Sequence, residues 1–184
     1  RLPQLVEAFR VGNAPAALPW EPEGRAEANR ARFINLLGTD WLPAIVDVDI
    51  RLRAEPPARV ADVACGTGWS SIAMAHAYPR ITVNGVDVDE DAIAAARHNA
   101  EKAGVAERVT LSVANASGLN LSGSYDLVTI LEALHDMPRP VEALRAAREL
   151  LGADGTVLVA DGLVPEEFTA PASLRERHEY GWSV

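Results

Sequence analysis

The segment from Val60 to Ser70, with the sequence VADVACGTGWS, constrains the fold of this chain more than any other. Its first half is apolar apart from Asp62, and its second half carries two glycines, Gly66 and Gly68. An acid, Asp87, follows the second glycine after about twenty residues, at the end of another apolar run. A strand that ends in a glycine turn and opens a helix is the unit from which open α/β sheets are built.

Beyond this segment, strand-like and helix-like runs alternate. Strands are predicted over 58–64, 81–86, 108–113, 125–131 and 156–160, and helices over 69–78, 90–103 and 138–151. Asp89 is expected to cap the 90–103 helix, and Asp154 with Gly155 to form the turn into the last strand. The run 126–131 lacks strict alternation, which is typical of a strand covered on both faces. The fold class predicted is α/β, with a doubly wound and mostly parallel sheet.

Around this core the chain divides into three regions. Residues 1–55 are expected to form an N-terminal helical extension or lid, with helices over 22–37 and 40–53. Residues 56–165 are the predicted core, and residues 166–184 a C-terminal helical segment. The few residues after Asp161 leave two alternatives open, an incomplete sheet and a fragment of a longer protein.

Composition excludes several classes of partner. The net charge of −9 argues against nucleic acid, whose binding depends on clustered lysine and arginine. The single cysteine, Cys65, rules out an internal disulfide, and no histidine spacing indicates a metal site. No apolar stretch reaches membrane-spanning length, so we expect a cytoplasmic chain without a membrane partner; a homodimer stays open.

The glycine turn predicts a ligand-binding loop. Backbone N–H groups at the start of the following helix would point into the crevice, and glycines allow close approach of the ligand. A dinucleotide needs a third glycine where this chain has Ser71, and its pyrophosphate would meet the bulky Trp69. The residues therefore favour an adenosine ligand without a pyrophosphate, with an NAD-dependent oxidoreductase as the alternative.

At this point the residues resemble the class I S-adenosylmethionine-dependent methyltransferases, in the branch similar to quinone biosynthesis enzymes. Residues 62–68, DVACGTG, resemble the first motif of that family, with Ala64 where the first glycine is usual. Asp87 matches the acid that holds the ribose, and Asn115 with Ala116 falls where relatives carry Asp-Ala near the adenine. Residues 125–136 and 150–161 resemble the fourth and fifth strands with their loops.

The resemblance implies a Rossmann-like methyltransferase fold. The family's usual C-terminal antiparallel hairpin is one part of the sheet that this chain is open to lacking. It implies that S-adenosylmethionine is the cofactor and S-adenosylhomocysteine the product, with Asp62 and the glycine loop at the methionine part. The expected cofactor-binding residues are Asp62, Ala64, Gly66, Thr67, Gly68, Asp87, Val88, Asn115, Ala116 and Glu132.

The function expected is transfer of a methyl group to a small-molecule acceptor. His135 is the candidate general base, needed only where the acceptor must lose a proton, and a role in shaping the loop is its alternative. Asp136 follows it directly, although neighbours on a loop need not face each other. A non-catalytic module that binds an adenosine ligand remains a third interpretation.

Overall fold

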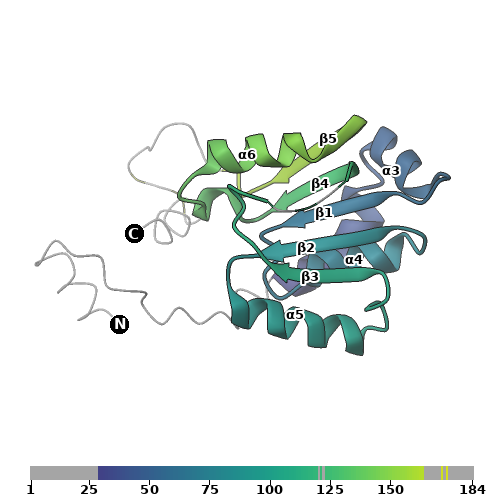
Figure 1. Ribbon diagram of the computed structural model, residues 1–184, viewed down its shortest axis with the longest axis horizontal. Coiled ribbons are helices and arrows are strands. Elements are labelled where there is room, and N and C mark those ends of the chain that lie inside the picture. The colour runs from purple at the N-terminus through teal and green to yellow at the C-terminus, as the bar shows by residue number, and fades with distance from the viewer. Residues whose placement is uncertain (1–28, 120, 122, 164–170, 172, 174–184) are drawn as a thin grey trace, which may run out of the picture.

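A computed structural model describes residues 29–119, 121, 123–163, 171 and 173. Its centre is a five-stranded sheet of order β3-β2-β1-β4-β5, in which every pairing is parallel. The strands are β1 (Arg59–Val63), β2 (Thr82–Asp87), β3 (Val109–Val113), β4 (Tyr125–Leu131) and β5 (Leu151–Ala160). This is the predicted Rossmann-like α/β fold, which the structure confirms (Figure 1). No antiparallel strand is present among the described residues.

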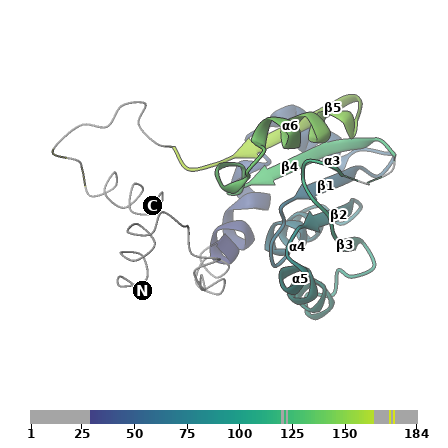
Figure 2. The ribbon, with the colours of Figure 1, turned by 60° about the vertical axis from the view of Figure 1, so that its left-hand side comes forward.

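Helices cover both faces of the sheet. They are η1 (Phe33–Trp41), a π-helix continuous with helical residues 29–32, α3 (Val46–Arg53), α4 (Trp69–Ala77), α5 (Glu90–Lys102), the short η2 (Leu134–Asp136) and α6 (Pro140–Glu149). α4, α5 and η1 pack on one face, and α6 on the other, beside β4 and β5 (Figures 1 and 2). Among the described residues, no helix has both the length and the apolar character needed to cross a bilayer.

β1 owes its central place to its composition. Val60, Ala61 and Val63 are fully buried, and they contribute to the two apolar cores on opposite faces of the sheet. β1 pairs with β2 on one side and with β4 on the other. The chain order therefore reverses between β1 and β4, and ligands of open α/β sheets bind at the carboxyl ends of the strands at such a point.

The N-terminal helices differ from those predicted. The break expected between 37 and 40 does not exist, because η1 runs through Gly38, and the chain turns only at 42–45 before α3 begins. A Cβ on Gly38 would lie 2.3 Å from the Cβ of Ala77 in α4. The glycine therefore allows two helices to approach closely, which a helix-breaking interpretation does not take into account. Residues 22–28 lie outside the described part.

β5 also differs from the prediction. It begins at Leu151, five residues before the expected start, and no separate turn stands at Asp154 and Gly155. The register instead shifts: Tyr125 pairs with Leu151, whereas Leu127 pairs with Thr156. A Cβ on Gly155 would lie 2.7 Å from the carbonyl oxygen of Tyr125, so the glycine serves close backbone contact within an irregular strand.

Candidate functional site

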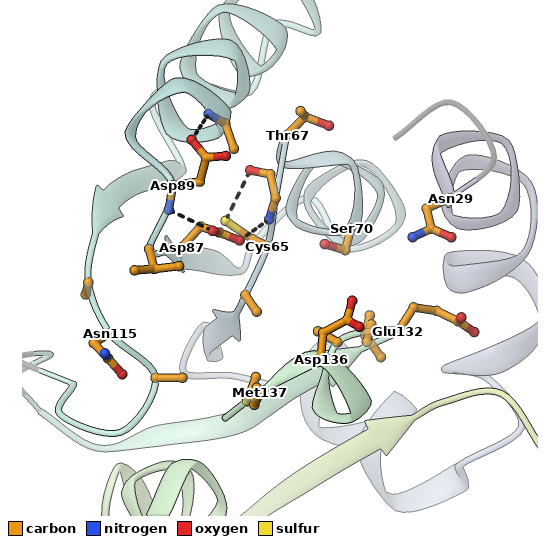
Figure 3. Close-up of a pocket in the computed structure, with 18 of the residues that line it drawn as sticks. Asn29, Cys65, Thr67, Ser70, Asp87, Asp89, Asn115, Glu132, Asp136 and Met137 are labelled. Atoms are coloured by element: carbon orange, nitrogen blue, oxygen red, sulfur yellow. Dashed lines mark hydrogen bonds between the residues drawn. The ribbon is translucent and has the colours of Figure 1, made fainter. Parts of the chain in front are cut away.

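A cavity of about 440 Å³ opens at the carboxyl ends of the strands, where the chain order reverses (Figure 3). Its wall comes from the loop after β1, the ends of β2 and β4, the loops after β3 and β4, and the N-terminal helix. In Figure 3, Asn115 and Asn29 stand on its two sides, with Asp87, Ser70 and Asp136 between them.

The loop after β1 is held in an unusual backbone conformation. Ala64 and Gly66 have φ values of 59° and 52°, in the left-handed region. Nothing lies within 4 Å of a Cβ built on Gly66. A glycine at this position therefore allows the left-handed backbone and leaves open space beside the cavity wall. Ala64, where the family usually has glycine, adopts this conformation in spite of its Cβ, which costs about 1 kcal/mol.

Asp87 fixes this loop. Its Oδ2 accepts the backbone N–H of Gly66 at 2.8 Å, and its Oδ1 accepts that of Asp89 at 3.0 Å. A carboxylate offers about four lone-pair sites, so Asp87 keeps acceptor capacity beyond these two hydrogen bonds. The predicted cap is confirmed as well, because Asp89 accepts the N–H groups of Asp91 and Ala92 at the start of α5.

Gly68 serves packing between helices. It stands just before α4 with a φ of 81°, and a Cβ there would lie 2.9 Å from the Cβ of Ala96 in α5. It is not part of the cavity wall. The structure therefore gives Gly68 a role in bringing α4 against α5, and through them in placing the loop.

Asp62 is enclosed behind the wall. It is 1% exposed, and its carboxylate accepts three hydroxyl groups, those of Ser70 and Ser71 at 2.6 Å and that of Thr129 at 2.8 Å. Burial raises the pKa of Asp62 above its usual value, and the three hydroxyl hydrogen bonds oppose that rise. A direct contact between Asp62 and a ligand in the cavity is not available in this arrangement, since Asp62 does not line it.

The loop after β3 forms another side of the cavity. Asn115 and Ala116 line it, and Oδ1 of Asn115 accepts the backbone N–H of Ser117 at 2.9 Å. Val88, at 69% exposure, presents an apolar surface in the same cavity. A flat apolar ring with polar edges suits this combination.

The cavity wall is acidic. Four carboxylates line it, those of Asp87, Asp89, Glu132 and Asp136, and none of the described lysine, arginine or histidine residues does so. A ligand with positive charge is favoured here, whereas a pyrophosphate would meet like charge with no cation in the wall to offset it.

Glu132 connects three parts of the molecule. It follows β4 with a φ of 54°, its N–H donates to the carbonyl of Ala160 at the end of β5, and its carboxylate pairs with Arg32 at 2.6 Å. Arg32 belongs to the helical turn just before η1, and Arg30 of the same turn lies over the ring of Trp69, 4.5 Å from its centroid. The N-terminal helix is thereby attached to the cavity on two sides.

His135 lies beside the cavity, with 44% of its side chain exposed and outside the wall. Its Nδ1 is 2.5 Å from Oδ1 of Asp161, whose Oδ2 accepts the backbone N–H of His135 at 3.2 Å. Its Nε2 lies 3.5 Å from Oδ1 of Asp136, which does line the cavity. The structure thus adds a partner, Asp161, that sequence reasoning did not assign to the histidine.

The residues predicted to bind the cofactor or to act in catalysis fall into two groups, those that line the cavity and those that do not. Ala64, Gly66, Thr67, Asp87, Val88, Asn115, Ala116 and Glu132 line the cavity, whereas Asp62, Gly68 and His135 do not. Sequence reasoning missed Ser70 in the wall, Asn29 and Phe33 from the N-terminal helix, and Asp161. The only available signal for Ser70 was its place in the first turn after the glycines.

Cys65 is a small, buried residue of the glycine loop. It is 7% exposed at the cavity wall, and burial together with the charges of Asp62 and Asp87 raises the pKa of its thiol. A thiol held protonated in this way is a poor nucleophile. Among the described residues, no group of three or more histidine, cysteine, aspartate or glutamate side chains is arranged to hold a metal ion.

Two curated proteins show the sequence relationship. The 27-O-demethylrifamycin SV methyltransferase of Amycolatopsis mediterranei is 34% identical over 68% of this chain and 47% of its own length. The ubiquinone biosynthesis O-methyltransferase of Ralstonia nicotianae is 32% identical over 75% of this chain and 53% of its own. The chain therefore spans about half the length of these relatives.

Solved structures share the fold. YcgJ of Bacillus subtilis has a TM-score of 0.55 and 28% identity, covering 60% of this chain and 46% of its own. The [4+2]-cyclase SpnF has a TM-score of 0.53 and 28% identity, covering 55% and 38%. PKMT2 of Rickettsia typhi, solved in complex with AdoHcy, has a TM-score of 0.50 and 25% identity, covering 55% and 20%. A cyclase among them means that the fold alone does not fix the reaction.

The family model described as a methyltransferase domain matches residues 55–183, which includes every strand and every wall of the cavity except the N-terminal helix. The chain therefore belongs to the methyltransferase domain family.

Proposed function

We propose that the cavity binds S-adenosylmethionine and that the protein transfers its methyl group to a hydroxyl group of a small, uncharged acceptor. The single observation that carries the proposal is the acidic wall at the ends of β2 and β4, which suits a cofactor with positive charge. Both curated relatives named above are methyltransferases, and one is described as an O-methyltransferase.

Each part of the cofactor has a counterpart in the chain. The free lone pairs of Asp87 suit the two ribose hydroxyls, and Val88, Ala116 and Asn115 suit the adenine ring. The loop of Ala64, Gly66 and Thr67 would face the methionine part. These residues are the ones predicted from the sequence.

When bound, S-adenosylmethionine supplies a methyl group on a positively charged sulfur, already activated for displacement. The chain's own task is to orient the acceptor, exclude water and accept a proton. The charge of Asp161 favours the proton of His135 on Nδ1, which leaves Nε2 with a lone pair for a hydroxyl proton. The imidazolium formed would stand between the carboxylates of Asp161 and Asp136.

The cavity wall also has an apolar part. Met137, Pro138, Phe33 and Trp69 line the cavity together with the acids. An anionic acceptor would be repelled by those acids, so the acceptor we propose is apolar in bulk and carries a neutral hydroxyl.

Calorimetric titration with S-adenosylhomocysteine, S-adenosylmethionine and NAD tests the cofactor. We expect the two sulfur ligands to bind and NAD not to bind. Asp87→Ala should weaken binding by about tenfold or more, the loss typical of a hydrogen bond to a charged group. Glu101→Gln removes a charge from an exposed position on α5 outside the cavity and should change nothing. Binding of NAD in place of the sulfur ligands would favour the oxidoreductase alternative.

Turnover separates an enzyme from a module that only binds the cofactor. A panel of phenols and aliphatic alcohols, assayed for S-adenosylhomocysteine release, is expected to yield an acceptor. Amines and carboxylates of the same size are the matched comparison, and a preference for carboxylates would contradict the proposed acceptor class.

A further inference from the structure

The N-terminal helix presents one polar and one apolar side chain to the cavity. Asn29 and Phe33 stand four positions apart, on the same face of that helix, and both line the cavity. In Figure 3 the Asn29 side chain points from the helix into the cavity, on the side opposite Asn115. A group bound at Asn29 therefore lies at the other end of the cavity from the contacts proposed for adenine.

The residues on either side of Asn29 hold its helical turn in place. Arg32 pairs with Glu132 at 2.6 Å, and Arg30 lies over the ring of Trp69. Asn29 itself is half-buried, and among the residues that the structure describes none forms a hydrogen bond or an ion pair with its side chain. Its amide is thus positioned by its neighbours and is available to a ligand.

The polar side chains from the start of α4 and the loop after β4 offer only hydrogen-bond acceptors. Ser70 donates its single hydroxyl hydrogen to Asp62, behind the wall, so only its lone pairs face the cavity. The ionised carboxylates of Glu132 and Asp136 can only accept. A ligand hydroxyl can donate to any of these oxygens, whereas a ligand carbonyl needs an N–H group. The amide of Asn29 supplies that N–H.

The charge beside Asn29 suits a neutral carbonyl group. Arg32, three positions along the helix, offsets the charge of Glu132, and Arg30 adds a second cation to the same turn. The partial negative charge of a carbonyl oxygen is therefore tolerated at this end of the cavity. A whole negative charge would still meet the acids of the wall.

We infer that Asn29 is a specificity-determining residue, which selects acceptors that carry a carbonyl group in addition to the hydroxyl group to be methylated. Its N–H donates to the carbonyl oxygen, and Phe33 packs against the apolar part of the acceptor. The inference rests on the proposed function and narrows its acceptor class. A hydrogen bond between neutral groups corresponds to about 3- to 10-fold in affinity.

Matched phenols test this inference on the chain saturated with S-adenosylhomocysteine. In meta-isopropylphenol a methyl group replaces the carbonyl oxygen of meta-acetylphenol, so the two differ in one hydrogen-bond acceptor at nearly equal size. Calorimetric titration should show that the ketone binds about 3- to 10-fold more tightly. The corresponding para isomers form a second pair, with a longer distance between the hydroxyl and the carbonyl.

Variants at Asn29 assign the preference to its amide. Asn29→Leu removes the amide at similar size and should abolish the preference for the ketone. Asn29→Asp keeps the shape but loses the N–H donor, so it should abolish the preference too, and it replaces Asn29→Leu if that variant does not fold. Asn35→Leu is the matched control, because Asn35 is exposed on the same helix and does not line the cavity. Binding of S-adenosylhomocysteine within about twofold of wild type shows that each variant is folded around the cavity.

Trp69→Phe covers the other N–H group in this part of the wall, that of the indole, and should retain the preference for the ketone. A preference that persists in Asn29→Leu, or that is lost in Trp69→Phe, would overturn the inference and leave the proposed function standing. A wild-type complex that binds the ketones no better than the isopropylphenols, or binds neither, would do the same.

Weaker binding of S-adenosylhomocysteine in both Asn29 variants would place Asn29 at the cofactor and would also overturn the inference. A wild-type chain that does not bind S-adenosylhomocysteine would overturn the proposed function and the inference together. Loss of the preference in the Asn29 variants, with its retention in Asn35→Leu, supports both.

Discussion

The backbone N–H of Gly66 donates to Oδ2 of Asp87 at 2.8 Å, so the acid after β2 holds the loop after β1. The same carboxylate receives the N–H of Asp89, where α5 begins. One side chain therefore sets the relative positions of two elements of the cavity wall. Asp87 has a structural task even before a ligand reaches its remaining lone pairs.

Gly68→Ala is expected to lower the free energy of unfolding by about 1–3 kcal/mol, because the new Cβ meets Ala96 at 2.9 Å and φ is 81°. Ala96→Gly in the same chain should recover the part of the loss that comes from the contact, but not the part that comes from φ. Urea unfolding of both variants measures this. Gly162→Ala is the control, since nothing lies within 4 Å of its Cβ; equal losses at 162 and 68 would contradict the packing role.

Ala64→Gly is expected to leave stability unchanged or raise it by up to about 1 kcal/mol, although glycine substitution usually destabilises. The reason is the φ of 59°, which glycine adopts without strain. Ala94→Gly, at an exposed position inside α5, is the comparison and should cost about 1 kcal/mol. Thermal unfolding of the pair checks the opposite signs, and a similar loss in both variants would contradict the strain at Ala64.

The pH dependence of stability should carry a signature of Asp62. Because its pKa is raised in the folded protein, its contribution to stability is fully present below the unfolded value and is lost as pH rises through the folded value. Asp62→Asn removes this titration. The difference in unfolding free energy between the variant and wild type should therefore shift in favour of the variant as pH rises from about 4. A shift in the opposite direction would mean that the three hydroxyl groups lower the pKa of Asp62 by more than burial raises it.

His135→Gln should reduce turnover by about 10²- to 10⁴-fold, the usual contribution of a general base, once an acceptor is known. Affinity for S-adenosylhomocysteine should stay within about twofold, since His135 is not part of the cavity wall. Asp161→Asn should also lower the rate, because it weakens the bond that directs the Nδ1 proton. An unchanged rate in His135→Gln would leave the histidine its alternative role in shaping the loop.

Patterns in the sequence predict single helices, strands and turns, but they do not predict contacts between residues that lie far apart in the chain. The glycine turn, the Asp89 cap and the five parallel strands follow from patterns within a few residues of one another. The Asp161 partner of His135 does not, because the two residues are 26 positions apart and meet only when β5 pairs with β4. Gly38 shows the reverse case, where a close contact with α4 overrides the usual effect of a glycine on a helix.

Asp62 was expected in the cavity wall and Ser70 was not, and one cause explains both differences. Asp62 matches the family's acid in sequence, but three hydroxyl groups surround it and Ser70 takes its place in the wall. No pattern in the sequence reports which of two neighbouring side chains a helix turns outward when both are small and polar. That choice depends on how α4 is rotated against β1, which is a property of packing.

The reversal of chain order between β1 and β4 separates the residues proposed to bind the cofactor from those proposed to act on the acceptor. Contacts suited to the cofactor come from β1, β2 and β3, whereas the histidine and its two acids come from β4 and β5. In the proposed function, insertions in the second half would change the acceptor, while the first half would keep the contacts proposed for the nucleoside. A family with this topology can therefore acquire new acceptors by changing only the loops on the β4 and β5 side of the reversal point.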